Sequence, residues 1–314
     1  MNLLASRDDG SLPQDAGTFW IVARLSLVAV LAGCTAKREA PQQAAASTQP
    51  HVVAFSTADY RFQAPDTISA GWTTFRFVNN GDDIHYAHIV RMDSAKSVTD
   101  LVAAYAEAIR TSAARPEWVK RFGGPGGTVP GDTSAVTQYL EAGNYVWICP
   151  VEDASGNPHF GRGEYRPFVV RSASTDAGRD AARPSASVTI RQLDFLFAFD
   201  PPLQAGHHTI RVENTGVEPH DLTLMKLLPG ATLEQVQAWL NPEKARRPGQ
   251  SSDPGVSPEN LVSLAGGIAA IAPGMEAFFE ADLPPGEYVL ACMATAPDGR
   301  SHIEHGMIQQ IRVQ

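Results

Sequence analysis

The sequence predicts an all-β protein made of two β-sandwiches in tandem, each with a short helical insertion. Apolar and polar residues alternate in short segments such as 73–79 and 209–214, which is the period of a half-buried strand. Gly143 and Gly286 stand directly before two further apolar runs and mark turns. The third observation is that the second half of the chain repeats the first.

The internal repeat is visible as pairs of like residues that keep a constant spacing within each of two stretches. A shared order of Asn, Gly, His, Tyr and Cys is not expected by chance and indicates duplication. The matched pairs are Asn79 and Asn214, Gly81 and Gly216, His85 and His220, Gly143 and Gly286, Tyr145 and Tyr288, Cys149 and Cys292, and His159 and His302.

The repeat sets the expected domain boundaries. We expect one domain over 51–171 and a second over 187–314, joined by a linker over 172–186 that is rich in Ser, Ala, Asp and Arg. A chain of 314 residues is long enough for two such domains. Apolar residues at helical spacing predict the insertions, over 98–111 and over 232–240.

The first 50 residues predict export. An apolar segment over 19–32, too short to span a membrane comfortably, ends in Leu-Ala-Gly before Cys34. This resembles the lipobox of bacterial lipoproteins, in which the signal is cut before a cysteine that becomes lipidated. We expect a signal peptide over 1–33, a lipid on Cys34 and a flexible tether over 34–50 that holds the protein on the periplasmic or extracytoplasmic face of a membrane.

Composition excludes several classes of function. The net charge is −9 and no basic tract occurs, so nucleic acid is not an expected partner. Neither a Gly-x-Ser-x-Gly motif nor a zincin motif is present, so nothing indicates a hydrolase.

The second half carries four residues of metal-binding type: His220, Cys292, His302 and Met307. The segment Asn-Thr-Gly-Val-Glu-Pro-His220, followed later by Cys, His and Met in one loop, resembles the cupredoxins; the long gap between Cys and His is similar to the type 1 site of copper nitrite reductases. The resemblance implies a Greek-key cupredoxin-like sandwich with type 1-like copper and electron transfer to a redox protein partner. One thiolate, two imidazoles and a weak thioether suit copper that alternates between Cu(I) and Cu(II).

Two alternatives stay open for this set. His305 competes with His302, but His302 is preferred because it is the residue that matches His159 in the repeat. Cys292 and Met307 are also small or flexible apolar residues that a metal-free sandwich would use for packing. A metal-free scaffold or binding lipoprotein is therefore the second interpretation.

The first half carries a related set in which a carboxylate replaces the thioether: His85, Cys149, His159 and Glu164. A carboxylate is a harder ligand and favours Cu(II). The red copper cupredoxin nitrosocyanin, which this set resembles, also uses a glutamate. We expect a structural domain without metal here first, and copper second. His88 would point to the opposite face of a strand from His85.

An enzyme is not expected. Copper oxidases and nitrite reductases use a second copper centre, connected by a histidine next to the type 1 cysteine. Here the neighbours are Ile148 and Pro150 in the first half, and Ala291 and Met293 in the second. The sequence therefore predicts a redox carrier or copper-binding protein rather than a two-domain oxidase.

Overall fold

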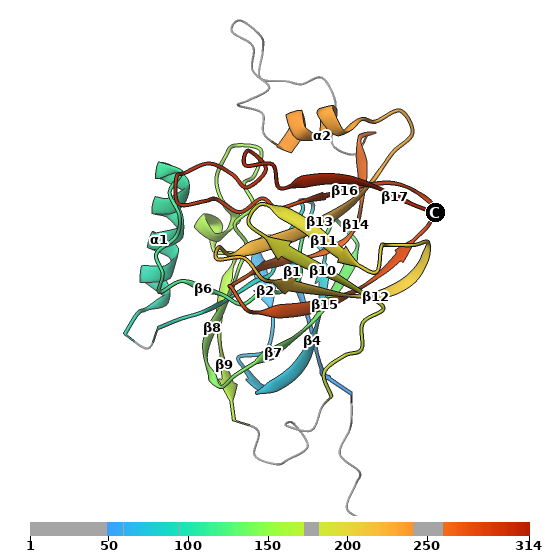
Figure 1. The fold of residues 1–314 in the computed structure, drawn as a ribbon. Helices are drawn as coiled ribbons and strands as arrows, with labels where there is room; N and C mark the ends of the chain where they lie inside the picture. Colours follow the sequence, from blue (N-terminus) through green and yellow to red (C-terminus); the bar gives the residue numbers. More distant parts are fainter. Residues whose placement is uncertain (1–48, 59, 94, 173–181, 241–259) are drawn as a thin grey trace, which may run out of the picture. The chain divides into compact units, whose positions relative to one another are not determined.

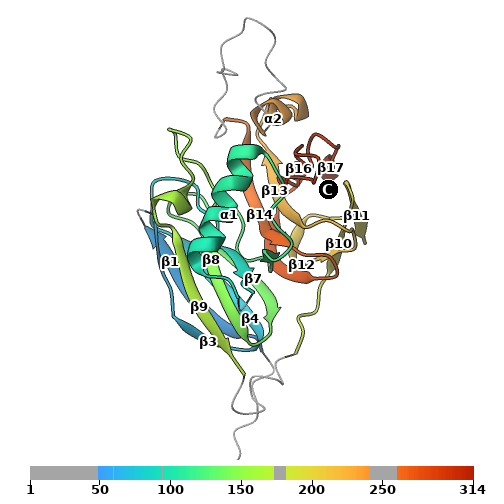
Figure 2. The same cartoon turned by 90° about the vertical axis from the view of Figure 1, so that its left-hand side faces the viewer.

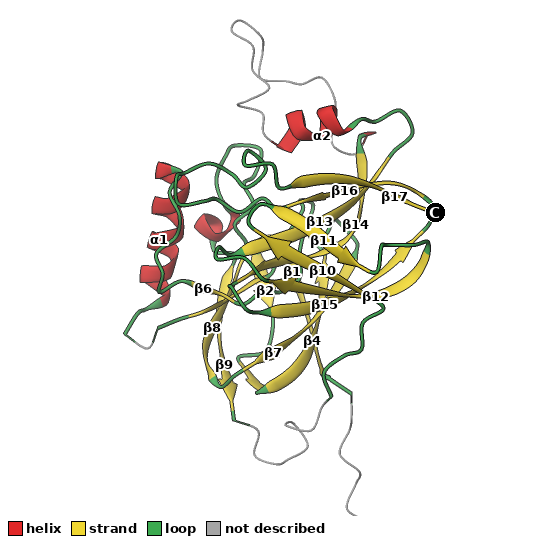
Figure 3. Ribbon diagram, in the orientation of Figure 1, coloured by secondary structure: helices red, strands yellow, loops and turns green. Residues whose placement is uncertain are grey.

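The computed structural model describes residues 49–314 except 59, 94, 173–181 and 241–259, and all of these belong to one compact unit. The predicted signal peptide, the lipidation site Cys34 and most of the tether lie outside the described residues, as does most of the linker. Within the described part the chain is built of strands with two short helices, so the all-β prediction is confirmed. Figure 3 shows the strands in yellow and the helices in red.

The elements follow the same general order in both halves of the chain (Figure 1). The first half contains β1 (His51–Ala58), β2 (Arg61–Gln63), β3 (Thr67–Ser69), β4 (Gly71–Asn79), β5 (His88–Arg91), α1 (Val98–Thr111), β6 (Lys120–Arg121), β7 (Thr133–Leu140), β8 (Gly143–Ile148), the 3-10 helix η1 (His159–Arg162) and β9 (Tyr165–Arg171). The second half contains β10 (Val188–Leu193), β11 (Leu196–Asp200), β12 (Gly206–Asn214), β13 (His220–Leu227), α2 (Leu233–Leu240), β14 (Val262–Ile271), β15 (Glu276–Leu283), β16 (Gly286–Ala291) and β17 (Ile308–Val313).

One eight-stranded sheet runs through both halves, in the order β11-β10-β12-β15-β7-β4-β1-β2. Its two four-stranded parts have matching orders, and β1 is parallel to β4 as β10 is parallel to β12. The parts meet where β7 pairs antiparallel with β15, Thr137 lying opposite Phe278. The strands of both halves are thus hydrogen-bonded to each other along β7 and β15. Two domains in tandem need not pair their strands in this way.

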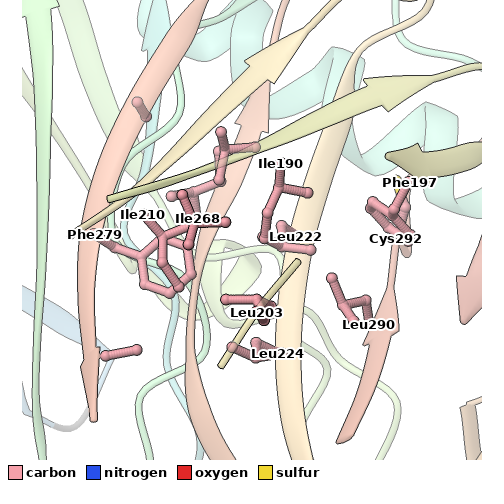
Figure 4. Packing of buried hydrophobic residues seen from close by; sticks show 14 of the residues in the cluster. Ile190, Phe197, Leu203, Ile210, Leu222, Leu224, Ile268, Phe279, Leu290 and Cys292 are labelled. Carbon is pink, nitrogen blue, oxygen red and sulfur yellow. The ribbon is translucent and has the colours of Figure 1, made fainter. Parts of the chain in front are cut away.

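Each half closes its sandwich with a smaller sheet. The five-stranded sheet β3-β9-β8-β5-β6 comes from the first half, and the four-stranded sheet β14-β13-β16-β17 from the second. Trp147 and Phe168 stack at 3.7 Å between ring centres in the first core. The second core contains Ile190, Leu222 and Cys292, which Figure 4 shows among their neighbours. Such close-packed interiors resist deformation and so hold side chains at their edges in fixed positions.

The helices lie against the smaller sheets. α1 begins at a capping box formed by Ser97 and Asp100, and it buries Leu101 and Tyr105 in a cluster with residues of β5 and β8. Figure 2 shows α1 in front of the sheet that contains β8. α2 follows Thr232, whose hydroxyl accepts a hydrogen bond from the Gln235 backbone N–H at 3.3 Å, which is the bond that an N-cap residue makes. None of the helices in the described ranges is both long and apolar enough to cross a membrane.

Candidate metal centres

Two strands of the second half and one loop bring its predicted ligands to one end of the sandwich. His220 is the first residue of β13, Cys292 directly follows β16, and His302 and Met307 lie in the loop before β17. The backbone N–H of Cys292 donates to the Met307 carbonyl at 3.1 Å, and that of Met307 donates to the His302 carbonyl at 2.8 Å. All four side chains are completely buried, so the loop is fixed around them.

The donor atoms of the second half converge on one point. The Nδ1 atoms of His220 and His302 are 2.9 Å apart, and Cys292 Sγ lies 3.3 Å from His302 Nδ1 and 3.7 Å from His220 Nδ1. Ligands at about 2.0–2.3 Å from a shared tetrahedral metal lie about 3.3–3.6 Å from one another. Met307 packs in the same buried cluster as Cys292. The arrangement therefore has the donors and spacing of a mononuclear metal site.

Two carboxylates hold the outer nitrogens of these histidines. His220 Nε2 lies 2.8 Å from Asp194 Oδ1, and His302 Nε2 lies 3.0 Å from Glu218 Oε2. A neutral imidazole that donates from Nε2 presents the lone pair of Nδ1, which is the form a metal requires. We assign this tautomer from the hydrogen bonds. A Cβ on Gly216 would come within 2.3 Å of Asp194 Oδ1, so only glycine leaves room for this contact.

Neither carboxylate belongs to the site predicted from the sequence. Glu218 could have been recognised, because it lies two residues before His220, inside the segment that marks the first ligand. Asp194 lies in the turn between β10 and β11 and reaches His220 only through the parallel pairing of β10 with β12. Its role depends on tertiary structure.

The environment favours neutral groups before a metal binds. Burial, with the nearby charge of Asp221, raises the pKa of the Cys292 thiol well above its usual value. Burial, with the neighbouring His220, lowers the pKa of His302 to about 3. Both imidazoles are thus ready to coordinate, whereas the thiol must release a proton to the solution on metal binding.

The first half brings together its own predicted set. His85 Nδ1 lies 3.2 Å from His159 Nδ1 and 2.7 Å from Glu164 Oε2. Cys149 Sγ lies 3.5 Å from His159 Nδ1, and Glu164 Oε2 lies 3.2 Å from the same nitrogen. All four side chains are buried, and their donor atoms all lie within 4.8 Å of one another. Four donor residues thus converge in the first half, whereas three converge in the second half beside the buried Met307.

Glu164 remains ionised although it is buried. Burial alone would raise its pKa, but hydrogen bonds from His159, His85 and Thr57 outweigh this effect and hold the pKa below its usual range. Burial and the Glu164 charge raise the pKa of the Cys149 thiol well above its usual value. The first site therefore carries a fixed negative charge that the second site, with Met307 at the matching position, does not.

The remaining histidines that the sequence singled out lie outside both clusters. His88 lies on β5 with its ring 5.6 Å from that of Tyr86, and is not among the convergent donors. His305 is bonded to Asp298 at 3.2 Å and stacks on Phe195. The geometry thus selects His302 over His305. Both described cysteines are free thiols, so they form no disulfide with each other.

The donor set of the second half fits copper. A thiolate, two imidazoles and a thioether are the soft and borderline ligands that copper accepts in both oxidation states. The first half offers a carboxylate in place of the thioether and so suits the harder Cu(II) better.

Neither a protein-family model nor a curated protein matches this sequence. Solved structures show distant likeness. Auracyanin from Roseiflexus castenholzii is 16% identical, with 40% of this chain and 98% of that chain covered and a TM-score of 0.28. Auracyanin A, a blue copper protein from Chloroflexus aurantiacus, is 20% identical, with coverages of 39% and 99% and a TM-score of 0.28. The blue copper oxidase from Nitrosomonas europaea is 13% identical, with coverages of 85% and 86% and a TM-score of 0.26. Because these identities and TM-scores are low, the case for a metal rests on the residues described above.

Proposed function

We propose that this protein is a copper-binding electron carrier of the cupredoxin type, with its redox site at His220, Cys292, His302 and Met307. The observation that carries the proposal is the convergence of one thiol and two Nδ1 atoms whose partner Nε2 atoms are already held by Asp194 and Glu218. Ligands fixed in this way need little rearrangement when a metal changes its charge.

The chain's own residues supply the rigidity that electron transfer needs. His220 is anchored in β13, and the N–H groups of Asp221 and Ala294 donate to the Cys292 sulfur. Copper bound by these ligands supplies a one-electron Cu(I)/Cu(II) couple. Backbone hydrogen bonds to the sulfur stabilise its thiolate form and so favour metal retention.

The carrier proposal is supported over an oxidase by the residues beside the cysteines. Cys149 is followed by Pro150 and Cys292 by Met293, so neither thiol has the adjacent histidine that would lead to a second copper centre. An oxidase would also need a separate oxygen- or substrate-reducing metal site. Among the described residues the only convergent ligand groups are the two already described.

An electron carrier must expose an apolar contact close to its metal ligands. Val217 has 83% of its surface exposed, and its backbone N–H donates to Asp194, the carboxylate that holds His220. We propose that a redox protein partner docks around Val217 and exchanges electrons with the second site there.

We propose that the first half also binds copper, at His85, Cys149, His159 and Glu164. The support is the burial of an ionised carboxylate among two imidazoles and a thiol, which a packing role alone does not require. A harder, anionic ligand stabilises Cu(II), so this site would have the lower potential of the two.

The lipid anchor remains part of the proposal. A lipid on Cys34 would tether the protein to a membrane of the cell envelope, with the tether over 34–50 giving reach to a partner. Radiolabelled fatty acid incorporation in the expressing bacterium, lost in Cys34→Ser, would test it.

The spectrum of the copper-loaded full chain tests the carrier proposal. One equivalent of Cu(II) should give an intense thiolate-to-copper absorption band. The matched variants Cys292→Ser and Cys149→Ser assign the band. Cys292→Ser should abolish the absorption of the site in the second half, and Cys149→Ser should leave that absorption unchanged. A colourless protein under copper excess would reject the carrier and favour the metal-free scaffold.

A further inference from the structure

A separate cavity lies between the two halves. It has a volume of about 340 Å³ and is lined by residues of both, including Tyr86, His88 and Arg121 from the first half and Asp221 and Met293 from the second. This volume is at the lower end of the range for small-molecule sites. None of these residues is a predicted metal ligand, so the proposed copper function leaves the cavity unexplained.

The cavity contains a buried cation whose guanidinium has no hydrogen-bond partner, although the nearby carboxylate of Asp221 attracts it. Arg121 is only 6% exposed, and its guanidinium makes no hydrogen bond or ion pair with any described residue. Arg115 lines the same cavity; its guanidinium lies over the Tyr105 ring at 4.3 Å, and its buried Nε has no hydrogen-bond partner in the described structure. Burial lowers the pKa of Arg121 to about 10, which leaves it cationic at neutral pH. A buried charge without hydrogen bonds costs free energy, and a ligand that supplies those hydrogen bonds lowers that cost.

Further polar residues line the same cavity. The Tyr86 hydroxyl is 3.5 Å from Thr223 Oγ1, a long contact that leaves it free to donate elsewhere. Burial and the two arginines lower the pKa of His88 to about 3, so this ring is neutral and adds no charge. Two acids line the cavity: Asp221 is buried, whereas Glu152 is exposed to solvent. Inside the cavity the two guanidiniums therefore outweigh Asp221, and the interior favours a monoanion.

Half of the residues that line the cavity are apolar. They can contact a hydrocarbon group but offer no hydrogen bonds to a hydrated ion from their side chains. They are Ile109, Pro150, Val151, Ala270, Met293 and Ala294. A ligand that satisfies both kinds of lining has one negatively charged planar group and a compact apolar body.

We propose that this cavity binds a small organic monocarboxylate. Its carboxylate would pair with Arg121 and Arg115, because a planar guanidinium fork matches two carboxylate oxygens. Its apolar body would lie against Met293 and the other apolar residues. The site is distinct from both metal clusters.

The cavity also touches the residues next to both cysteines. Tyr86 donates its backbone N–H to Cys149 Sγ at 3.3 Å, and Asp221 Oδ1 accepts from the Met293 N–H at 2.9 Å. A bound carboxylate would contact Tyr86 and Met293 and so shift the absorption bands of copper at both centres. This consequence rests on the proposed copper function, whereas binding of the carboxylate itself does not.

Isothermal titration of the metal-free full chain with benzoate at pH 7 tests the site. Benzamide, a neutral molecule of nearly the same shape, is the control for the apolar lining, and sodium chloride at equal ionic strength is the control for the charge. We expect benzoate to bind at least about tenfold more tightly than benzamide, the difference expected of a charge-assisted pair. Equal affinities would overturn the proposal.

Variants locate the binding. Arg121→Gln should weaken benzoate binding at least about tenfold, because the buried guanidinium that would pair with the carboxylate is removed. Lys120→Gln removes a charge from the exposed neighbouring residue and should leave benzoate binding unchanged. Should Arg121→Gln fail to fold, Arg115→Gln gives the same comparison at a half-buried loop position. Benzoate affinity that is unchanged in the folded arginine variant would contradict the proposed site.

Discussion

The Nδ1 atoms of His220 and His302 face each other at 2.9 Å, while the opposite nitrogen of each ring is bonded to a carboxylate. If both rings donate from Nε2, two lone pairs point at each other in a buried site. A cation between them, or a proton shared by them, relieves this repulsion. The pair is therefore arranged for a positive charge that the protein does not itself provide.

The outer carboxylate of His220 should contribute to metal affinity. Asp194→Asn keeps the shape of the side chain but removes the charge that fixes the His220 tautomer. We expect copper affinity to fall about 10- to 100-fold, the usual loss for a group that orients a metal ligand. Competition with a chelator of known affinity measures it. Asp200→Asn, on β11 and away from the histidines, is the control, and equal losses in the two variants would contradict the assigned role.

The difference between Glu164 and Met307 should set the order of the two potentials. Glu164→Met gives the first site the donor set of the second, and Met307→Glu does the reverse. Because a carboxylate favours Cu(II), the first change should raise the potential of its site and the second should lower it. Redox titration of each variant in a Cys292→Ser or Cys149→Ser background isolates one centre. Shifts of the opposite sign would contradict the ligand assignment.

Gly216 should be indispensable at the second site. An added Cβ would lie 2.3 Å from Asp194 Oδ1 and 2.9 Å from His220 Nε2, so Gly216→Ala must separate two groups that are hydrogen-bonded. We expect about 1–3 kcal/mol lower stability, measured by urea unfolding, together with weaker copper binding. At Gly161 the nearest atom to an added Cβ is 3.6 Å away, so Gly161→Ala should be tolerated. Similar losses in both variants would show that the close approach at Gly216 is unimportant.

The stability of the metal-free protein should fall in acid partly because of His88. Burial, then the charges of Arg115 and Arg121, lower its pKa from 6.5 to about 3. Between these two values the unfolded chain binds a proton that the folded chain excludes, so folding is favoured above pH 6.5 and loses free energy as the pH falls. His88 alone contributes a slope of up to about 1.4 kcal/mol per pH unit. Urea unfolding from pH 7 to pH 4 should show a shallower slope in His88→Gln, and identical slopes would contradict this cause.

Local patterns predicted much of this molecule. The helical spacing over 98–111 matches α1 (Val98–Thr111), because an amphipathic helix is encoded by neighbours three and four residues apart. The repeat also pointed to the ligands that converge in each half, since a strand end and a loop of fixed length place them. The domain boundaries over 51–171 and 187–314 stay predictions.

Features that join distant parts of the chain were not predictable. The pairing of Thr137 with Phe278 depends on which strand edges remain free after each half has folded. Asp194 reaches His220 only through the register of two parallel strands. The cavity around Arg121 exists only where the halves meet. A single sequence contains no periodicity that reports such contacts.

X-ray absorption at the copper edge, on the copper-loaded Cys149→Ser protein, tests the central claim most directly. With the first thiol removed, we predict one sulfur at a thiolate distance and two imidazole nitrogens around the metal, from Cys292, His220 and His302. A coordination shell of oxygen and nitrogen alone would contradict the account.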